Sequence, residues 1–117
     1  MRNSGRGAVD TLPPVNALDR FDSDRHFQVW LYQVGHAQLL VRSVKRRDDE
    51  RRIDVLFKNV TRIDLPTSFD GLRIQRRDEV FEMECDRWRG RVTAGACFQA
   101  DDDGEYFDPS PFAESLA

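Results

Sequence analysis

Hydrophobic and polar positions are patterned most clearly between residues 27 and 65. Four short runs, at 27–34, 37–45, 52–58 and 60–65, are rich in Val, Ile, Leu and aromatic residues, and turn formers or charges close each of them. Short apolar runs bounded in this way predict strands, and close spacing of consecutive strands predicts an antiparallel meander. The pattern therefore indicates an all-β fold.

The first two runs are joined by Gly35 and His36, which suit a two-residue type II′ turn because Gly accepts a positive φ at the first central position. The predicted cross-strand pairs are Tyr32 with Leu39, Leu31 with Leu40 and Trp30 with Val41. Both faces of this hairpin are then largely apolar, which is typical of a hairpin at the centre of a fold. We therefore expect Trp30 and Tyr32 to lie in the core or in a buried groove.

The alternation continues towards the C-terminus. Val55 and Phe57 share one face of the third run, and Phe81 and Met83 share one face of a later strand. The further predictions are strands at 72–75, 80–85 and 92–100, a loop at 66–71 with a tight Asp-Gly turn, and a turn at 89–90. We expect six or seven antiparallel strands in a meander that forms a curled sheet, an open barrel or a two-layer sandwich, with at most a short C-terminal helix.

Length and composition are those of a single small domain. The chain has 117 residues, of which 39% are hydrophobic and 33% charged, and its formal net charge is −3. Glycine and proline interrupt any regular pattern near the N-terminus, so we expect residues 1–25 to be a flexible N-terminal segment and residues 26–117 to be one β-domain. The charge balance provides no global basic field for nucleic acid.

The cellular location is inferred from what the sequence lacks. No apolar run approaches the roughly 20 residues of a membrane span, and residues 1–20 contain no apolar stretch of the signal-peptide kind. We therefore expect a cytoplasmic protein in which Cys85 and Cys97 are reduced thiols. Two cysteines without a CxxC spacing do not make a zinc site alone, and we assign no cofactor.

The sharpest local feature is the acidic segment 101–108. Carboxylates at Asp101, Asp103 and Glu105, with a glycine between the last two, are hard oxygen ligands of the kind that bind Ca²⁺. The EF-hand spacing fails, because aligning that glycine with the invariant glycine of the motif puts Ser110 where a bidentate Glu belongs. We expect a solvated acidic turn, with a metal-dependent role as an alternative.

Basic residues gather around one tryptophan. Trp88 stands among Arg87, Arg89 and Arg91, and His36 occupies the predicted hairpin turn. Because Trp is favoured at protein interfaces, we expect Trp88 to be exposed and these five residues to mark an interaction surface. Arginines beside an exposed aromatic also suit single-stranded nucleic acid, although nearby Asp and Glu residues neutralise most of the basic groups.

Several motifs resemble those of small bacterial proteins. They are Trp30-x-Tyr32, Gly35-His36-x-Gln38-Leu39-Leu40-Val41-Arg42-Ser43, Ile53-Asp54-Val55-Leu56-Phe57-Lys58, Leu65-Pro66-Thr67 and Glu105-Tyr106-Phe107-Asp108-Pro109-Ser110. The chain resembles a family of small bacterial β-domain proteins of unknown function over most of residues 30–107. The resemblance implies no particular activity and carries over no functional residue.

These features predict a non-catalytic module that binds a protein partner or associates with itself. No His–nucleophile pair stands out as a catalytic centre, so we do not expect an enzyme. Two alternatives remain open. One is a small β-barrel that binds nucleic acid, and the other is a metal-dependent protein that uses the acidic C-terminal loop.

Overall fold

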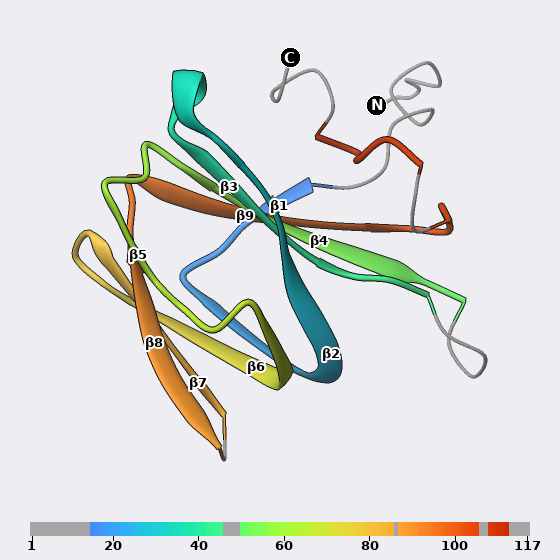
Figure 1. Cartoon of the computed structure of the whole chain (residues 1–117), viewed down its shortest axis with the longest axis horizontal. Coiled ribbons are helices and arrows are strands. Elements are labelled where there is room, and N and C mark those ends of the chain that lie inside the picture. Colours follow the sequence, from blue (N-terminus) through green and yellow to red (C-terminus); the bar gives the residue numbers. More distant parts are fainter. Residues whose placement is uncertain (1–14, 46–49, 86, 106–107, 113–117) are drawn as a thin grey trace, which may run out of the picture.

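A computed structural model describes residues 15–45, 50–85, 87–105 and 108–112. They form one antiparallel sheet of nine strands in the order β1-β9-β4-β3-β2-β6-β7-β8-β5 (Figure 1). The strands are β1 (Val15–Ala17), β2 (Arg20–Gln33), β3 (Gln38–Ser43), β4 (Arg52–Lys58), β5 (Arg62–Asp64), β6 (Ser68–Arg77), β7 (Val80–Cys85), β8 (Trp88–Thr93) and β9 (Ala96–Asp102). The all-β antiparallel prediction is confirmed. In the described part of the chain β1 and β5 do not pair with each other, so the sheet is not a closed barrel.

The curled sheet bends along strand β2. This strand is 14 residues long, and it pairs with β6 over residues 20–28 and with β3 over residues 28–33. The register shifts after Ser23 and again between Val29 and Leu31, and such bulges increase the local twist of a strand. The sheet therefore folds into a first half of β1, β9, β4 and β3 and a second half of β6, β7, β8 and β5, which Figure 1 shows on either side of β2.

The core lies between the two halves. Phe57 of β4 and Phe81 of β7 meet there with ring centroids 5.5 Å apart and ring planes at 74°, a favoured edge-to-face geometry. Both side chains are fully buried, as are Val55 and Met83, so the alternation predicted for these strands is confirmed. A smaller apolar cluster on the outer face of the first half consists of Leu40, Leu56, Ala100 and Phe112.

Strand β3 is central, as predicted for the hairpin, but the end of β2 is not buried and the turn between the two strands differs. All six residues of β3 are buried. The connection contains a 3₁₀ helix, η2 (Val34–His36), followed by Ala37 in the left-handed region with φ 51°. The positive φ thus falls on Ala37 and not on Gly35, so the predicted type II′ turn is wrong.

The longer turn preserves part of the predicted register. Tyr32 lies opposite Leu39 and Leu31 opposite Leu40, as predicted. Further from the turn the register shifts, because Trp30 is the extra residue of the bulge. Val29, rather than Trp30, therefore lies opposite Val41.

Two predicted turns lie inside strands. Asp70 and Gly71 belong to β6, where Gly71 has φ 80° and a Cβ on it would overlap the Cys85 Sγ. Gly90 belongs to β8, and a Cβ there would overlap the Asp64 carbonyl oxygen of β5. Close approach of a neighbouring strand, and not a chain reversal, requires these glycines.

The simple meander is also wrong beyond β4. After Asn59, which has φ 56°, the chain runs to the far edge of the sheet, where β5 pairs with β8. The predicted strand at 92–100 is divided between β8 and β9. Strand β9 returns to pair with β4, so strands that are distant in sequence are neighbours in the sheet. The sheet has nine strands and not the six or seven expected.

The sheet begins earlier than the sequence suggests. Residues 15–25, which we expected in a flexible N-terminal segment, lie partly in β1 and at the start of β2, while residues 1–14 are outside the described residues. The predicted C-terminal helix falls mainly on residues 113–117, also outside them. Across the described ranges, no helix has the length and apolar character needed to span a membrane.

Candidate protein-interaction surface

Large apolar side chains are exposed where β2 ends. Trp30, Leu31 and Tyr32 are 37%, 40% and 40% exposed, and Val34 in the following turn is 78% exposed. We call these four residues the apolar end of β2. The prediction that Trp30 and Tyr32 are buried is wrong, because β6 pairs with β2 only as far as Gln28.

The apolar end of β2 also has an open backbone edge. The Val29 N–H donates to the Thr67 carbonyl oxygen at 2.8 Å. Beyond that bond, no strand among the described residues pairs with β2 on the side away from β3. Residues 30–33 therefore form a sheet edge, although the N-terminal part of the same strand is interior. The bulge at Trp30 lies where one pairing gives way to the other, and bulges are common at sheet edges.

No charged side chain protects this edge. From Phe27 to Val41 the chain contains no Asp, Glu, Lys or Arg, in a sequence that is 33% charged. Sheet edges are ordinarily protected by charges, by bulges or by being short, and the edge at residues 30–33 has the bulge at Trp30 but no charge. The outer strand β5 follows that rule, because it has 3 residues and includes Arg62 and Asp64. An uncharged apolar edge is a template on which another strand can add.

A buried ion pair holds Trp30 in place. The Arg42 guanidinium carbon lies 4.8 Å from the centre of the Trp30 ring, and Arg42 Nε donates to Asp54 Oδ1 at 2.7 Å. Arg42 and Asp54 are only 2% and 1% exposed, and the Ser110 hydroxyl donates to the same carboxylate. A desolvated cation over an indole face stabilises that geometry, so Arg42 favours the observed position of the Trp30 ring.

A second buried arginine, Arg52, anchors the C-terminal segment on the first half of the sheet. Its guanidinium donates to the Asp102 carboxylate at 2.6 and 2.9 Å and to the carbonyl oxygens of Glu105, Asp108 and Pro109, each at 2.8 Å. Burial opposes ionisation of both partners, but their mutual hydrogen bonds and charges outweigh it. The pKa of Asp102 is lowered and the pKa of Arg52 is raised.

Three carboxylates of the acidic segment 101–108 are paired with basic side chains. The ion pairs are Asp101 with Arg51 at 3.3 Å, Asp102 with Arg52 at 2.6 Å and Glu105 with Lys45 at 2.6 Å. Within the ranges that the structure describes, no group of three or more His, Cys, Asp and Glu side chains is placed to hold a metal ion. Charge pairing therefore neutralises part of the predicted acidic turn among the residues that the structure describes.

Trp88, the centre of the predicted interaction surface, packs on the core. Its ring centroid lies 4.4 Å from that of Phe69, and the side chain is half-buried. Its buried Nε1 atom has no hydrogen-bond partner among the described residues. The prediction of an exposed Trp88 is therefore wrong, and the ring contributes to stability.

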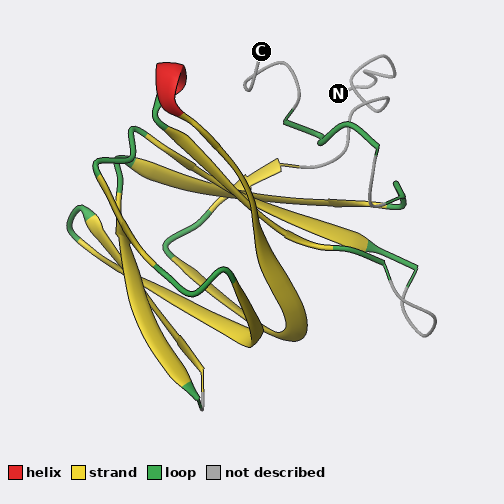
Figure 2. Cartoon of the chain, in the orientation of Figure 1, coloured by secondary structure: helices red, strands yellow, loops and turns green. Residues whose placement is uncertain are grey.

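Two of the predicted arginines, Arg87 and Arg89, line an open pocket with Trp88, together with Arg73, Glu84 and Cys85, whereas His36 lies apart from them. Arg87, Arg89 and Arg91 are exposed. Cross-strand pairing places Glu84 opposite Arg89 and Glu82 opposite Arg91, so this face alternates in charge. His36 lies in η2, at the opposite end of the molecule from the β7–β8 turn (Figure 2), with its Nδ1 3.2 Å from Gln33 Oε1.

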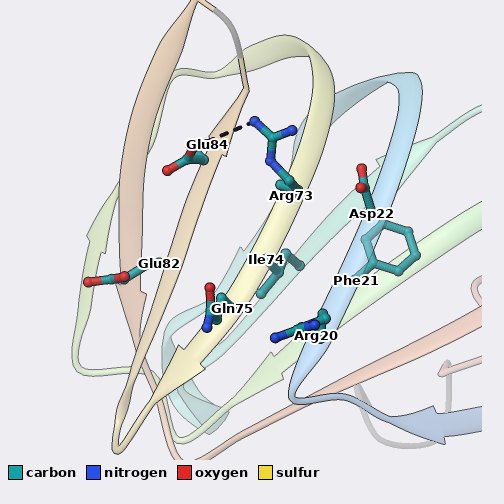
Figure 3. A pocket seen from close by; sticks show the side chains of 8 residues that line it. All are labelled: Arg20, Phe21, Asp22, Arg73, Ile74, Gln75, Glu82 and Glu84. Carbon is teal, nitrogen blue, oxygen red and sulfur yellow. Dashed lines mark ion pairs between the residues drawn. The ribbon is translucent and has the colours of Figure 1, made fainter.

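An open depression crosses β2, β6 and β7 (Figure 3). Its volume is about 390 Å³, and its lining residues are Arg20, Phe21, Asp22, Arg73, Ile74, Gln75, Glu82 and Glu84. Charges alternate across it, because Arg73 lies opposite Asp22 on one side and forms a 3.5 Å ion pair with Glu84 on the other. The lining residues include no Ser, Cys or His, so the depression offers no nucleophile or imidazole base.

Comparison with protein-family models, with curated proteins and with solved structures finds no match to this chain. The resemblance to small bacterial β-domain proteins therefore stays a prediction. The described residues form a small all-β domain in which the end of β2 is an exposed, uncharged sheet edge.

Proposed function

We propose that this protein is a non-catalytic protein-binding module that takes an extended apolar segment as an added strand on the apolar end of β2. One observation carries the proposal. The side chains of Trp30, Leu31, Tyr32 and Val34 are exposed around an open edge with no charged residue from Phe27 to Val41. A segment added there gains main-chain hydrogen bonds and packs its alternate side chains against these residues.

The arrangement of the other polar groups supports a binding role over a catalytic one. His26 and Asp70 form an exposed pair with Nδ1 and Oδ1 2.7 Å apart. Among the described residues, no Ser or Cys side chain forms a hydrogen bond to that His. Burial raises the pKa of the Cys97 thiol, so the sulfur is a poor nucleophile at neutral pH.

Peptide selection tests the proposal. A phage-displayed library of random peptides is panned on the immobilised full chain and on two variants, Leu31→Ser and Ile63→Ser. Leu31 and Ile63 are 40% and 38% exposed, so the Ile63 variant is a matched control on a different edge. We expect peptides rich in Val, Ile, Leu and aromatic residues that bind the wild type and Ile63→Ser and bind Leu31→Ser at least tenfold more weakly. Equal binding to all three proteins would overturn the proposal.

A further inference from the structure

We infer that the segment which docks on the apolar end of β2 is the same edge of a second copy, so that the chain forms a symmetric dimer through two β2 edges. This inference rests on the proposed function, because it names the partner of that surface. Its two supports are the charge of the edge and the position of its side chains, and the size of the edge sets the strength expected of the dimer.

The charge of the edge favours self-pairing. In a two-fold symmetric contact the same surface meets itself, so a charged group near the axis faces its own like charge. From Phe27 to Val41 there is no Asp, Glu, Lys or Arg, and the neighbouring Arg42 is neutralised by its buried pair with Asp54, so two such edges can meet without like charges facing each other. An acidic or basic segment would find no counter-charge on this edge, whereas an identical edge matches its apolar character.

The side chains lie on both faces of the open edge. Leu31 lies opposite Leu40, on the outer face of the sheet, and Tyr32 lies opposite Leu39, on the core side. Trp30 stands on the outer face with Arg42 against its ring. Pairing two edges would therefore join apolar side chains above and below the new strand pair, which removes them from water on both faces at once.

The size of the surface sets the strength of the dimer. With about 200 Å² for an aromatic side chain, the exposed fractions of the four residues amount to roughly 300–400 Å² on each copy. A stable interface buries about 800 Å² on each partner. We therefore expect a reversible dimer that forms at high protein concentration and not an obligate one.

Sedimentation equilibrium of the full chain over a hundredfold concentration range tests the inference. We expect the average mass of the wild type to rise from 13.6 kDa towards twice that value. The dissociation constant should rise at least tenfold in Leu31→Ser and in Val34→Ser, and should not change in Ile63→Ser. Val34→Ser is the second variant because Val34 is 78% exposed. We expect this variant to fold even if Leu31→Ser does not. Added salt should not weaken the dimer, because the edge residues are uncharged and the nearby Arg42 is buried in an ion pair with Asp54.

Each other outcome overturns the inference in a distinct way. If the wild type stays monomeric but binds apolar peptides, and Leu31→Ser weakens that binding, the dimer is excluded and the proposed function stands. A dimer that Ile63→Ser abolishes and Leu31→Ser retains places self-association on another edge. A monomer that also binds no peptide contradicts both the inference and the proposed function.

Discussion

The guanidinium of Arg42 lies against the ring of Trp30, 4.8 Å from its centre, and the Asp54 carboxylate holds that guanidinium at 2.7 Å. This contact connects a buried ion pair on the outer face of the sheet to the exposed end of β2. A flexible aromatic would lose conformational entropy on binding. A ring that is already packed against Arg42 would lose less, which favours binding at the proposed surface.

The buried Arg52 cluster should contribute far more to stability than the exposed ion pair beside it. Arg52→Ala leaves the Asp102 carboxylate and three backbone carbonyls without their donor, so we expect a loss of about 3–5 kcal/mol in the free energy of unfolding. The neighbouring Arg51→Ala breaks a 3.3 Å pair between half-exposed side chains and should cost less than about 1 kcal/mol. Urea unfolding of both variants measures the difference, and equal losses would show that the Arg52 cluster is not buried.

Stability should fall in acid partly through Asp102. Its folded-state pKa is lowered, so its contribution is complete above its ordinary pKa of about 3.9 and is lost as the pH falls through the lower folded value. Asp102→Asn should be less stable than the wild type at pH 7 and should show a flatter stability profile below about pH 5. Thermal melts across that range test this, and parallel profiles would contradict it.

Gly71 should be intolerant of a side chain. Its φ of 80° and the closeness of the Cys85 Sγ, which a Cβ on Gly71 would overlap, both oppose alanine, so Gly71→Ala should cost more than about 1 kcal/mol. Gly35→Ala is the control, because a Cβ there would meet nothing within 4 Å, and it should change stability by less than about 0.5 kcal/mol. Denaturant unfolding measures both variants. Adding Cys85→Ala to Gly71→Ala should restore part of the loss. No restoration would mean that the backbone conformation alone causes it.

Phe57 should be a principal core residue. It is fully buried and packs edge-to-face on Phe81 between the two halves of the sheet. Phe57→Ala should therefore cost about 3–5 kcal/mol, and Phe57→Leu, which keeps most of the volume, should cost less. Denaturant unfolding measures both. A loss near zero for Phe57→Ala would place the side chain outside the core.

The strands of the central hairpin and their alternation could be predicted because side-chain period and local turn chemistry determine them. The nonlocal pairings could not. Gly71 and Gly90 look like turn residues in the sequence, yet the neighbouring strands approach them too closely for a Cβ. Nonlocal strand pairing also decides which tryptophan is exposed, so the candidate surface could not be predicted from local sequence. The sequence around Trp30 and the sequence around Trp88 are each compatible with a buried or an exposed side chain. Trp30 is exposed because β6 pairs with β2 only as far as Gln28. The uncharged run from Phe27 to Val41 was the one local signal of this surface.

The most direct test of the binding surface is amide hydrogen exchange, measured residue by residue with and without a selected apolar peptide and at low and high protein concentration. We expect exchange to slow at residues 30–33 when either the peptide or a second copy occupies the edge, with no change at residues 87–91. Slowing at residues 87–91, or unchanged exchange at residues 30–33 under both conditions, would contradict the assignment of the binding surface to the apolar end of β2.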